Sequence, residues 1–337
     1  MNGRERVFAM IEGRDVDCLP FMPITMQFAA DLIEVPYLQY ETDFRALVEG
    51  QLRAAEEFDL DYVNTMSDPV IEASDCGAVG VFHPNSPAAV DESNPFLSDP
   101  SSLTGLGIPG PTSGRMGNRV RAVAELKQRV GNEKMVEGWI EGPCAQAADL
   151  RGLSPLMLDL YDEPGFVVDL FEFVLEMELQ FARAQVDAGA DVIGIGDAAA
   201  SLIGPRFYRE YVWPFEKRMV DAIHGMGAKV RLHICGNTTA ILDGMGALGC
   251  DIVDLDFLSP VEEGRQEMGA DQVILGNIDP VRVLRDGTPG GIYQEVEKCH
   301  RAAGKRFIVG PGCEVTRDTS HENLRAMGRY ARSRREG

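Results

Sequence analysis

The sequence predicts a (β/α)8 barrel, and two observations carry that prediction. Eight short β-rich runs recur along the chain, each ending in Gly, Asp, Asn or Pro and each followed by a longer amphipathic stretch. Several runs are preceded by turn signals of the Ala-Gly-Ala-Asp or Met-Gly-Ala-Lys kind, as expected where a helix ends. Eight units of strand then helix are typical of a closed parallel barrel. A doubly wound open sheet is the alternative, but no Gly-rich phosphate loop follows the first run.

The predicted strands, in chain order, are residues 19–28, 61–66, 134–142, 191–197, 229–236, 251–257, 272–279 and 306–313. Helical periodicity is clearest over residues 166–188, 205–226 and 291–303. Residues 67–119, rich in Pro, Gly, Ser and Asn, are too long for a plain connection. We expect them to form an insertion after the second strand, on the catalytic rim, where it could serve as a lid. No linker divides the chain, so we expect one domain over residues 1–337.

Composition limits the classes of function. The chain has 53 acidic against 32 basic residues, and a net charge of −21 opposes binding to nucleic acids and to anionic membrane surfaces. It contains neither a signal-peptide pattern nor an apolar run long enough to span a membrane, so we expect a soluble cytoplasmic protein. Seven scattered Cys residues favour thiol or metal chemistry over a disulfide framework.

Polar residues gather at the carboxyl ends of the predicted strands, which in a (β/α)8 barrel face the active site. Candidate catalytic groups are Asp68 after strand two, Glu141 at the end of strand three and Asp197 at the end of strand four. Candidate cofactor-binding groups are Glu72, Asn277 and Asp279. Each Asp could instead cap the helix that follows it or orient another ligand.

The sharpest local pattern is the His-Ile-Cys sequence that ends the fifth strand. Residues two apart on a strand point the same way, so His233 and Cys235 both face the barrel interior. Cys313 ends strand eight on the same rim, inside a Gly-Pro-Gly-Cys turn. One His and two thiolates suit zinc, and three protein ligands leave a fourth position open, as in catalytic sites. The alternative is a core His beside a buried Cys; Cys76 and Cys144 lie on the rim side and could also approach a metal.

Three stretches near the carboxyl end carry a family resemblance: LHICGNTTAIL, VILGNIDPVRVLRDGTP and VGPGCEVTRDTSHENLRAM. They resemble the uroporphyrinogen decarboxylase superfamily, and within it the zinc-dependent methyltransferases that act with methylated corrinoids. The resemblance extends over nearly the whole chain and implies a (β/α)8 barrel with an N-terminal helix. In the methyltransferase branch the zinc ligands are the His and Cys of H-x-C-G and the Cys of G-P-G-C. By this resemblance they correspond to His233, Cys235 and Cys313.

The decarboxylase branch fits less well. Its first strand leads into an Arg-containing M-R-Q-A-G-R-Y motif that holds a polycarboxylate substrate, whereas residues 25–30 here read TMQFAA, without Arg. The catalytic Asp of that branch does have a counterpart, Asp68. A decarboxylase, and a non-catalytic barrel that binds zinc or a small ligand, therefore stay as alternatives.

The resemblance implies a methyl transfer in one of two directions. A thiol such as coenzyme M would take the methyl group of a methylated corrinoid, or a methylated small molecule would give its methyl group to a corrinoid protein. The sequence does not choose between them. It lacks a D-x-H-x-x-G corrinoid-binding motif, so we expect the corrinoid (cobalamin) to come free or on a partner protein, docked by residues 67–119.

Overall fold

A computed structural model describes residues 1–334 of the chain. Its main sheet has seven parallel strands in the order β1-β4-β5-β6-β7-β8-β9. The strands are β1 (Tyr62–Asn64), β4 (Met135–Glu141), β5 (Val192–Gly196), β6 (Lys229–Ile234), β7 (Ile252–Leu255), β8 (Val273–Leu275) and β9 (Phe307–Ile308). They follow chain order without a reversal, so the sheet has no switch point of the kind that a doubly wound fold requires.

Residues 20–24 close the sheet into a barrel between β9 and β1. Phe21 forms a parallel bridge with Val309, and the Asp61 N–H donates to the Phe21 carbonyl at 3.1 Å. The predicted first strand, 19–28, is therefore shorter than expected, and helix α2 begins at Gln27. Pro20 and Pro23 limit the ladder of this segment, because neither has an N–H to give to a neighbouring strand. With this segment counted, the predicted (β/α)8 barrel is confirmed.

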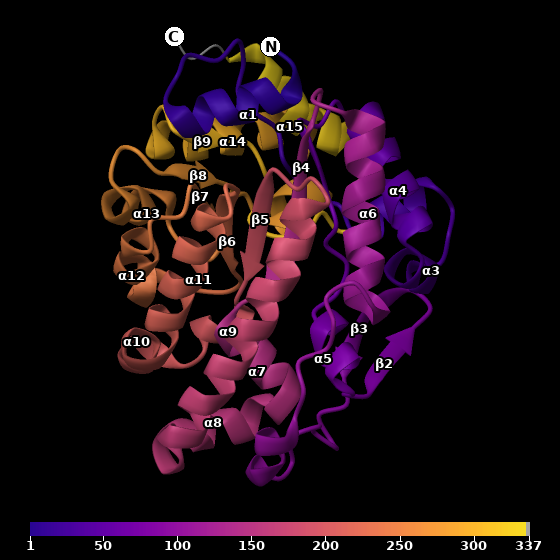
Figure 1. Ribbon diagram of the computed structural model, residues 1–337. Helices are drawn as coiled ribbons and strands as arrows, with labels where there is room; N and C mark the ends of the chain where they lie inside the picture. Colours follow the sequence, from indigo (N-terminus) through magenta and orange to yellow (C-terminus); the bar gives the residue numbers. More distant parts are fainter. Residues whose placement is uncertain (335–337) are drawn as a thin grey trace.

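Helices surround the sheet (Figure 1). They are α1 (Gly3–Glu12), α2 (Gln27–Leu32), α3 (Tyr37–Thr42), α4 (Phe44–Glu57), α5 (Ile71–Cys76), α6 (Gly114–Val130), α7 (Pro143–Arg151), α8 (Leu153–Asp162), α9 (Pro164–Asp187), α10 (Gly204–Phe207), α11 (Trp213–Gly225), α12 (Leu242–Ala247), α13 (Val261–Met268), α14 (Pro289–Ala303) and α15 (His321–Ser333). The helices predicted over 166–188 and 291–303 correspond to α9 and α14. The one predicted over 205–226 is interrupted by a π-helical turn at Tyr208–Val212, just before Pro214, which cannot donate to the preceding turn.

Residues 67–119 lie between β1 and β4 in sequence. They contain α5, a hairpin of β2 (Gly80–His83) and β3 (Ser86–Val90), a 3-10 helix at Pro100–Gly105, and the start of α6. Asp68 and Pro69, at the beginning of this segment, line the cavity described below. A role for the segment as a lid or docking surface stays a prediction.

Aspartates set the strand starts at the amino-terminal face of the barrel. Each precedes a strand and accepts an N–H from the neighbouring strand or closing segment: Asp61 from Phe21 at 2.7 Å, Asp191 from Val136 at 3.1 Å, and Asp251 from Val230 at 2.9 Å. This face lies at the end of the molecule that holds α1, α15 and both termini, opposite α7 and α8 (Figure 1).

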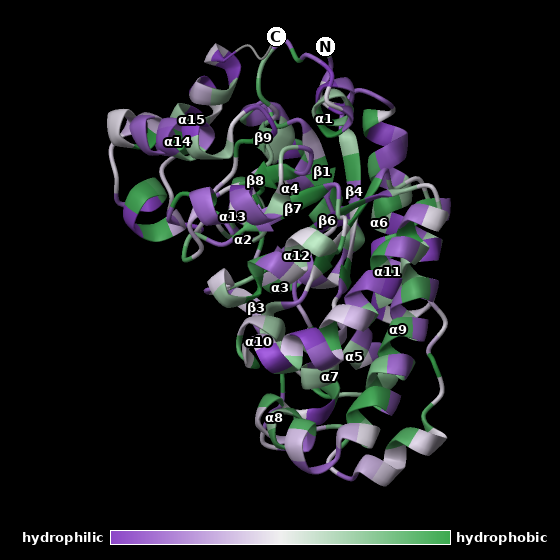
Figure 2. Cartoon of the chain, turned by 90° about the vertical axis from the view of Figure 1, so that its left-hand side faces the viewer, coloured by the Kyte–Doolittle hydropathy of each residue, from purple (hydrophilic) through white to green (hydrophobic). Residues whose placement is uncertain are grey.

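The buried apolar side chains of the described residues form one continuous cluster. Hydrophobic residues concentrate on the strands, whereas many outer helices have hydrophobic and hydrophilic sides (Figure 2). No helix within residues 1–334 is both long and apolar enough to cross a membrane.

Candidate metal centre and its cavity

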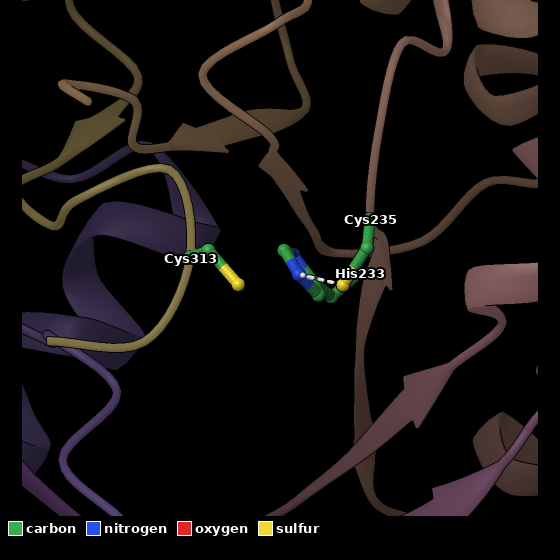
Figure 3. Close-up of side chains that lie close together, drawn as sticks. All are labelled: His233, Cys235 and Cys313. Carbon is green, nitrogen blue, oxygen red and sulfur yellow. Dashed lines mark hydrogen bonds between the residues drawn. The ribbon is translucent and has the colours of Figure 1, made fainter. Parts of the chain in front are cut away.

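The carboxyl ends of two strands bring the predicted ligands together. His233 lies on β6 and Cys235 directly after it, while Cys313 follows β9 and reaches the same rim from the other side (Figure 3). Gly236 has φ +92°, a left-handed conformation that lets the chain turn away immediately after Cys235. The alternation expected from the sequence holds here.

The three side chains fit a zinc ion. Their ligand atoms lie within 4.8 Å of one another, and His233 Nε2 is 3.1 Å from Cys235 Sγ. A tetrahedral zinc site would space such N and S atoms about 3.5–3.8 Å apart, given its usual bond lengths. No other group of three His, Cys, Asp or Glu side chains in residues 1–334 comes as close together. Cys76 and Cys144 are not part of the group; Cys144 is buried in α7.

The three ligands already share protons and charge. A hydrogen bond from Cys235, helped by the His233 charge, lowers the pKa of Cys313 to about 4. The same contact and burial raise the pKa of Cys235. Burial alone would lower the pKa of His233, but the charges of Cys235 and Asp254 outweigh it and raise that pKa well above its usual value. A cation in this position would replace the shared protons.

A buried charged layer holds His233 from behind. Its Nδ1 is 3.2 Å from both the carbonyl oxygen and Oδ2 of Asp254 on β7, which directs Nε2 towards the thiols. Arg231 binds Asp254 at 2.5 Å and Glu137 at 2.9 Å, and all three are fully buried in the barrel. Sequence reasoning missed this layer. The signal was present, because Arg231 lies two residues before His233 and therefore faces the same interior.

A cavity of about 240 Å³ opens beside the three ligands. Apolar side chains form much of its wall: Ile24, Met26, Met66, Pro69, Trp139 and Ala198. Three carboxylates, those of Asp68, Glu141 and Glu314, complete it, and no Lys or Arg in the described part of the chain lines it. A cavity of this size takes a small molecule only.

Glycines on β5 make room for the Trp139 indole. A Cβ on Gly194 would lie 2.1 Å from the ring, and one on Gly196 would lie 2.9 Å from it. Gly196 also pairs with Glu141 on one side and His233 on the other. Glu141, Gly196 and His233 therefore lie side by side on three neighbouring strands, and all three line the cavity.

Glu141 belongs to a group of buried carboxyls behind the cavity wall, together with Glu72 and Glu178. Burial, with repulsion from Asp68, raises the pKa of Glu72 to about 8. Burial, with repulsion from Glu72, raises the pKa values of Glu141 and Glu178 well above their usual values. Trp139 Nε1 donates to Glu141 at 3.3 Å. Glu72, predicted to bind a cofactor, is buried and does not line the cavity, so that role stays a prediction.

Asp68 and Glu314 lie on the cavity wall in different settings. Arg115 binds both oxygens of Asp68 at 2.7 Å, and the Ser67 hydroxyl donates to it as well. Glu314 accepts the Gln27 N–H at 2.7 Å. Sequence reasoning did not single out Glu314, although it directly follows the ligand Cys313.

The other predicted site residues stabilise loops. Asp197 is fully buried and accepts N–H groups from Ala145 and Cys144 at the start of α7; burial raises its pKa to about 7. Asn277 donates to carbonyls of the loop after β7, and Asp279 accepts from the two residues after Pro280. None of the three lines the cavity. Their catalytic or binding roles stay predictions.

Comparisons with known proteins identify the family of the chain. The uroporphyrinogen decarboxylase (URO-D) family model matches residues 2–334. The chain is 27% identical to methylcobamide:CoM methyltransferase MtbA of Methanosarcina acetivorans, over 98% of this chain and 97% of that protein. A uroporphyrinogen decarboxylase of a Synechococcus strain is also 27% identical, but over only 63% and 62%.

A methyltransferase structure from Methanosarcina mazei superposes with a TM-score of 0.89 at 22% identity, covering 99% of this chain and 98% of that one, which shows the shared fold. The predicted resemblance to the methyltransferase branch is therefore confirmed. The chain belongs to the uroporphyrinogen decarboxylase (URO-D) family.

Proposed function

We propose that this protein is a zinc-dependent methyltransferase that moves a methyl group between a corrinoid and a small thiol. The observation that carries the proposal is the His233, Cys235 and Cys313 group, open on one side to a cavity for a small molecule. The relatives that match the chain over its whole length are named methylcobamide:CoM methyltransferases, which supports the corrinoid and thiol as reactants.

Zinc held by these residues would supply a Lewis acid that lowers the pKa of a bound thiol. The protein's own groups prepare the site. Asp254 fixes the orientation of His233, and the apolar wall keeps water away from the sulfur that reacts. In the overall reaction the S–C bond forms as the Co–C bond breaks. The electron pair of the Co–C bond stays on cobalt, which passes from Co(III) to Co(I), and the thiol proton is released.

The corrinoid is too large for the 240 Å³ cavity and would bind over the rim. Exposed apolar side chains follow two strand ends there: Leu202 after β5, and Phe257 and Leu258 after β7. An apolar surface of this kind suits a corrinoid or the protein that carries one.

The cavity lining also argues against the decarboxylase alternative. A polycarboxylate substrate needs several cations, and within the described residues the lining offers three carboxylates and no Lys or Arg.

The test is anaerobic incubation of zinc-loaded protein with methylcobalamin and a panel of small thiols, followed by the visible spectrum of the corrinoid. We expect protein-dependent loss of the methylcobalamin spectrum and formation of the methylated thiol. A second set with methylated amines, ethers and thioethers and cobalt(I) corrinoid reports the opposite direction. A corrinoid spectrum that is unchanged with every thiol and every thioether contradicts the proposal.

A further inference from the structure

The cavity wall contains acidic side chains and no Lys or Arg among the described residues. Apart from the metal ligands, its ionisable groups are Asp68, Glu141 and Glu314. A ligand with a negatively charged tail would be repelled by these carboxylates, and no cation on the wall would bind it.

The guanidinium groups around the cavity are already bound to other protein groups. Arg115 gives both of its Nη atoms to Asp68, and Arg119 is buried against Ser67 and the Glu41 carbonyl. Arg231, on the other side, is bound by Glu137 and Asp254 beneath Trp139. None of the three lines the cavity.

The carboxyls that lie behind Glu141 also have no basic side chain paired with them in the described part of the chain. Glu72 and Glu178 are almost fully buried, and no ion pair involves Glu72, Glu141 or Glu178 anywhere in residues 1–334. Burial and the neighbouring carboxyls raise the pKa values of Glu141 and Glu178 well above their usual values, and a positive partner at this wall would offset that cost.

Trp139 and Glu141 together form a wall that suits a cation. An indole face attracts ammonium groups, and a carboxylate accepts their N–H bonds. Both side chains line the cavity on the same strand, two residues apart, and Trp139 Nε1 donates to Glu141 at 3.3 Å. Glu141 and His233 are two strand spacings apart, about 10 Å between backbones. A sulfur at the candidate metal ligands and an ammonium at Glu141 would therefore lie within reach of one small molecule.

We propose that the small substrate of this site carries a positive charge close to its sulfur, which Glu141 and Trp139 recognise, and that anionic thiols are disfavoured. This inference rests on the proposed function for the sulfur's position and names the substrate class for the same cavity. It distinguishes this chain from relatives whose name specifies CoM, a thiol with a sulfonate.

The experiment uses three thiols that share one two-carbon skeleton: 2-aminoethanethiol, 2-mercaptoethanol and 2-mercaptoethanesulfonate. Zinc-loaded protein is assayed with each for methyl transfer from methylcobalamin, and each rate is divided by the rate without protein to remove intrinsic thiol reactivity. Calorimetry then measures binding of the three S-methyl products without any corrinoid. We expect the ammonium compound to bind at least about tenfold more tightly than the alcohol, and the sulfonate to bind most weakly.

Two variants test whether the preference for an ammonium group depends on Glu141. Glu141→Gln should reduce the ratio of ammonium to alcohol binding by about tenfold. Glu176→Gln, an exposed carboxylate on α9, is the matched control and should keep the wild-type ratio.

Equal binding of the three products, or tightest binding of the sulfonate, overturns the inference. A preserved ammonium preference in Glu141→Gln overturns the assignment to this wall. Failure of methyl transfer with every thiol, alongside a clear ammonium preference in calorimetry, would count against the proposed function and leave the charge preference standing.

Discussion

The two ends of the barrel differ in the ion pairing of several buried carboxyls, although Asp68 at the carboxyl-terminal face is paired with Arg115. At the amino-terminal face, Asp61 is bound by Arg6 and Arg332, and Asp191 by Arg4 and Lys127. At the carboxyl-terminal face, Glu72, Glu141 and Glu178 have no ion-pair partner in the part of the chain that the structure describes. These carboxylic acids, Asp at one end and Glu at the other, differ in the cations that surround them.

This difference separates stability from function. A paired carboxylate at a strand start fixes register and helps hold the terminal helices to the barrel. An unpaired one beside a cavity costs free energy of folding, and such groups with strongly raised pKa values concentrate at functional sites. We therefore assign binding and chemistry to the carboxyl-terminal face, in keeping with its candidate metal ligands.

The largest expected effect is on the functional face. Cys313→Ser removes a metal ligand, and we expect methyl transfer to fall by more than about 100-fold, since even outer partners of metal ligands are worth 10–100-fold. The melting temperature, measured on metal-free protein, should change little because Cys313 is only partly buried. Cys299→Ser, which changes a thiol outside the candidate metal group, should retain activity. Equal losses of activity in both variants would contradict the assignment of function to the carboxyl-terminal face.

The opposite result is expected at the amino-terminal face. Asp61→Asn leaves Arg6 and Arg332 without their shared partner, so the free energy of unfolding should fall by about 2–3 kcal/mol. Urea unfolding measures the loss. Zinc content and the rate of methyl transfer at low temperature should stay near wild type, because Asp61 lies at the end of the barrel away from the cavity. An unchanged urea midpoint would contradict the stabilising role of this face.

A smaller effect, in pH dependence, is expected for the unpaired group. The pKa of Glu72 is raised to about 8 in the folded protein from 4.5, so between these values the folded state binds more protons than the unfolded state. Stability from this group is therefore present below about pH 4.5 and is lost as pH rises towards 8. Glu72→Gln should flatten the fall in melting temperature over this window, by on the order of a few degrees. A steeper fall in the variant would contradict the sign of the shift.

The smallest expected effect concerns the rim. Leu202→Ser removes an exposed apolar side chain after β5, and we expect a rise of about threefold in KM for the corrinoid, with kcat for the thiol reaction nearly unchanged. Leu158→Ser, an equally exposed leucine on α8, is the matched comparison. Equal changes in both variants would argue against a specific corrinoid surface at Leu202.

Local periodicity made the barrel, and the placement of the candidate metal ligands on its rim, predictable from the sequence. Strand spacing and turn signals located the strands of the barrel, and the two-residue spacing placed His233 and Cys235 on one face. The limited ladder of the first strand was also predictable, because Pro20 and Pro23 cannot donate to it. The Asp254 contact could not be inferred from spacing, because it depends on how β7 pairs with β6.

Side-chain direction explains why other rim residues could not be placed in advance. Asp197 ends β5 as predicted, but the start of α7, which follows a different strand, draws its carboxylate away from the cavity. The wall around Trp139 also depends on a neighbour, since only the pairing of β4 with β5 shows that Gly194 and Gly196 face the indole. Such non-local pairings decide which rim residues line the cavity.

The most direct test of the metal centre is the metal content of protein purified without chelator, measured by inductively coupled plasma mass spectrometry. We predict close to one zinc ion per chain in the wild type, a large loss in His233→Ala and Cys313→Ser, and full retention in Cys299→Ser. Wild-type protein that does not hold zinc even after incubation with it, or variants that bind as much as the wild type, would contradict the assignment of His233, Cys235 and Cys313 as the metal centre.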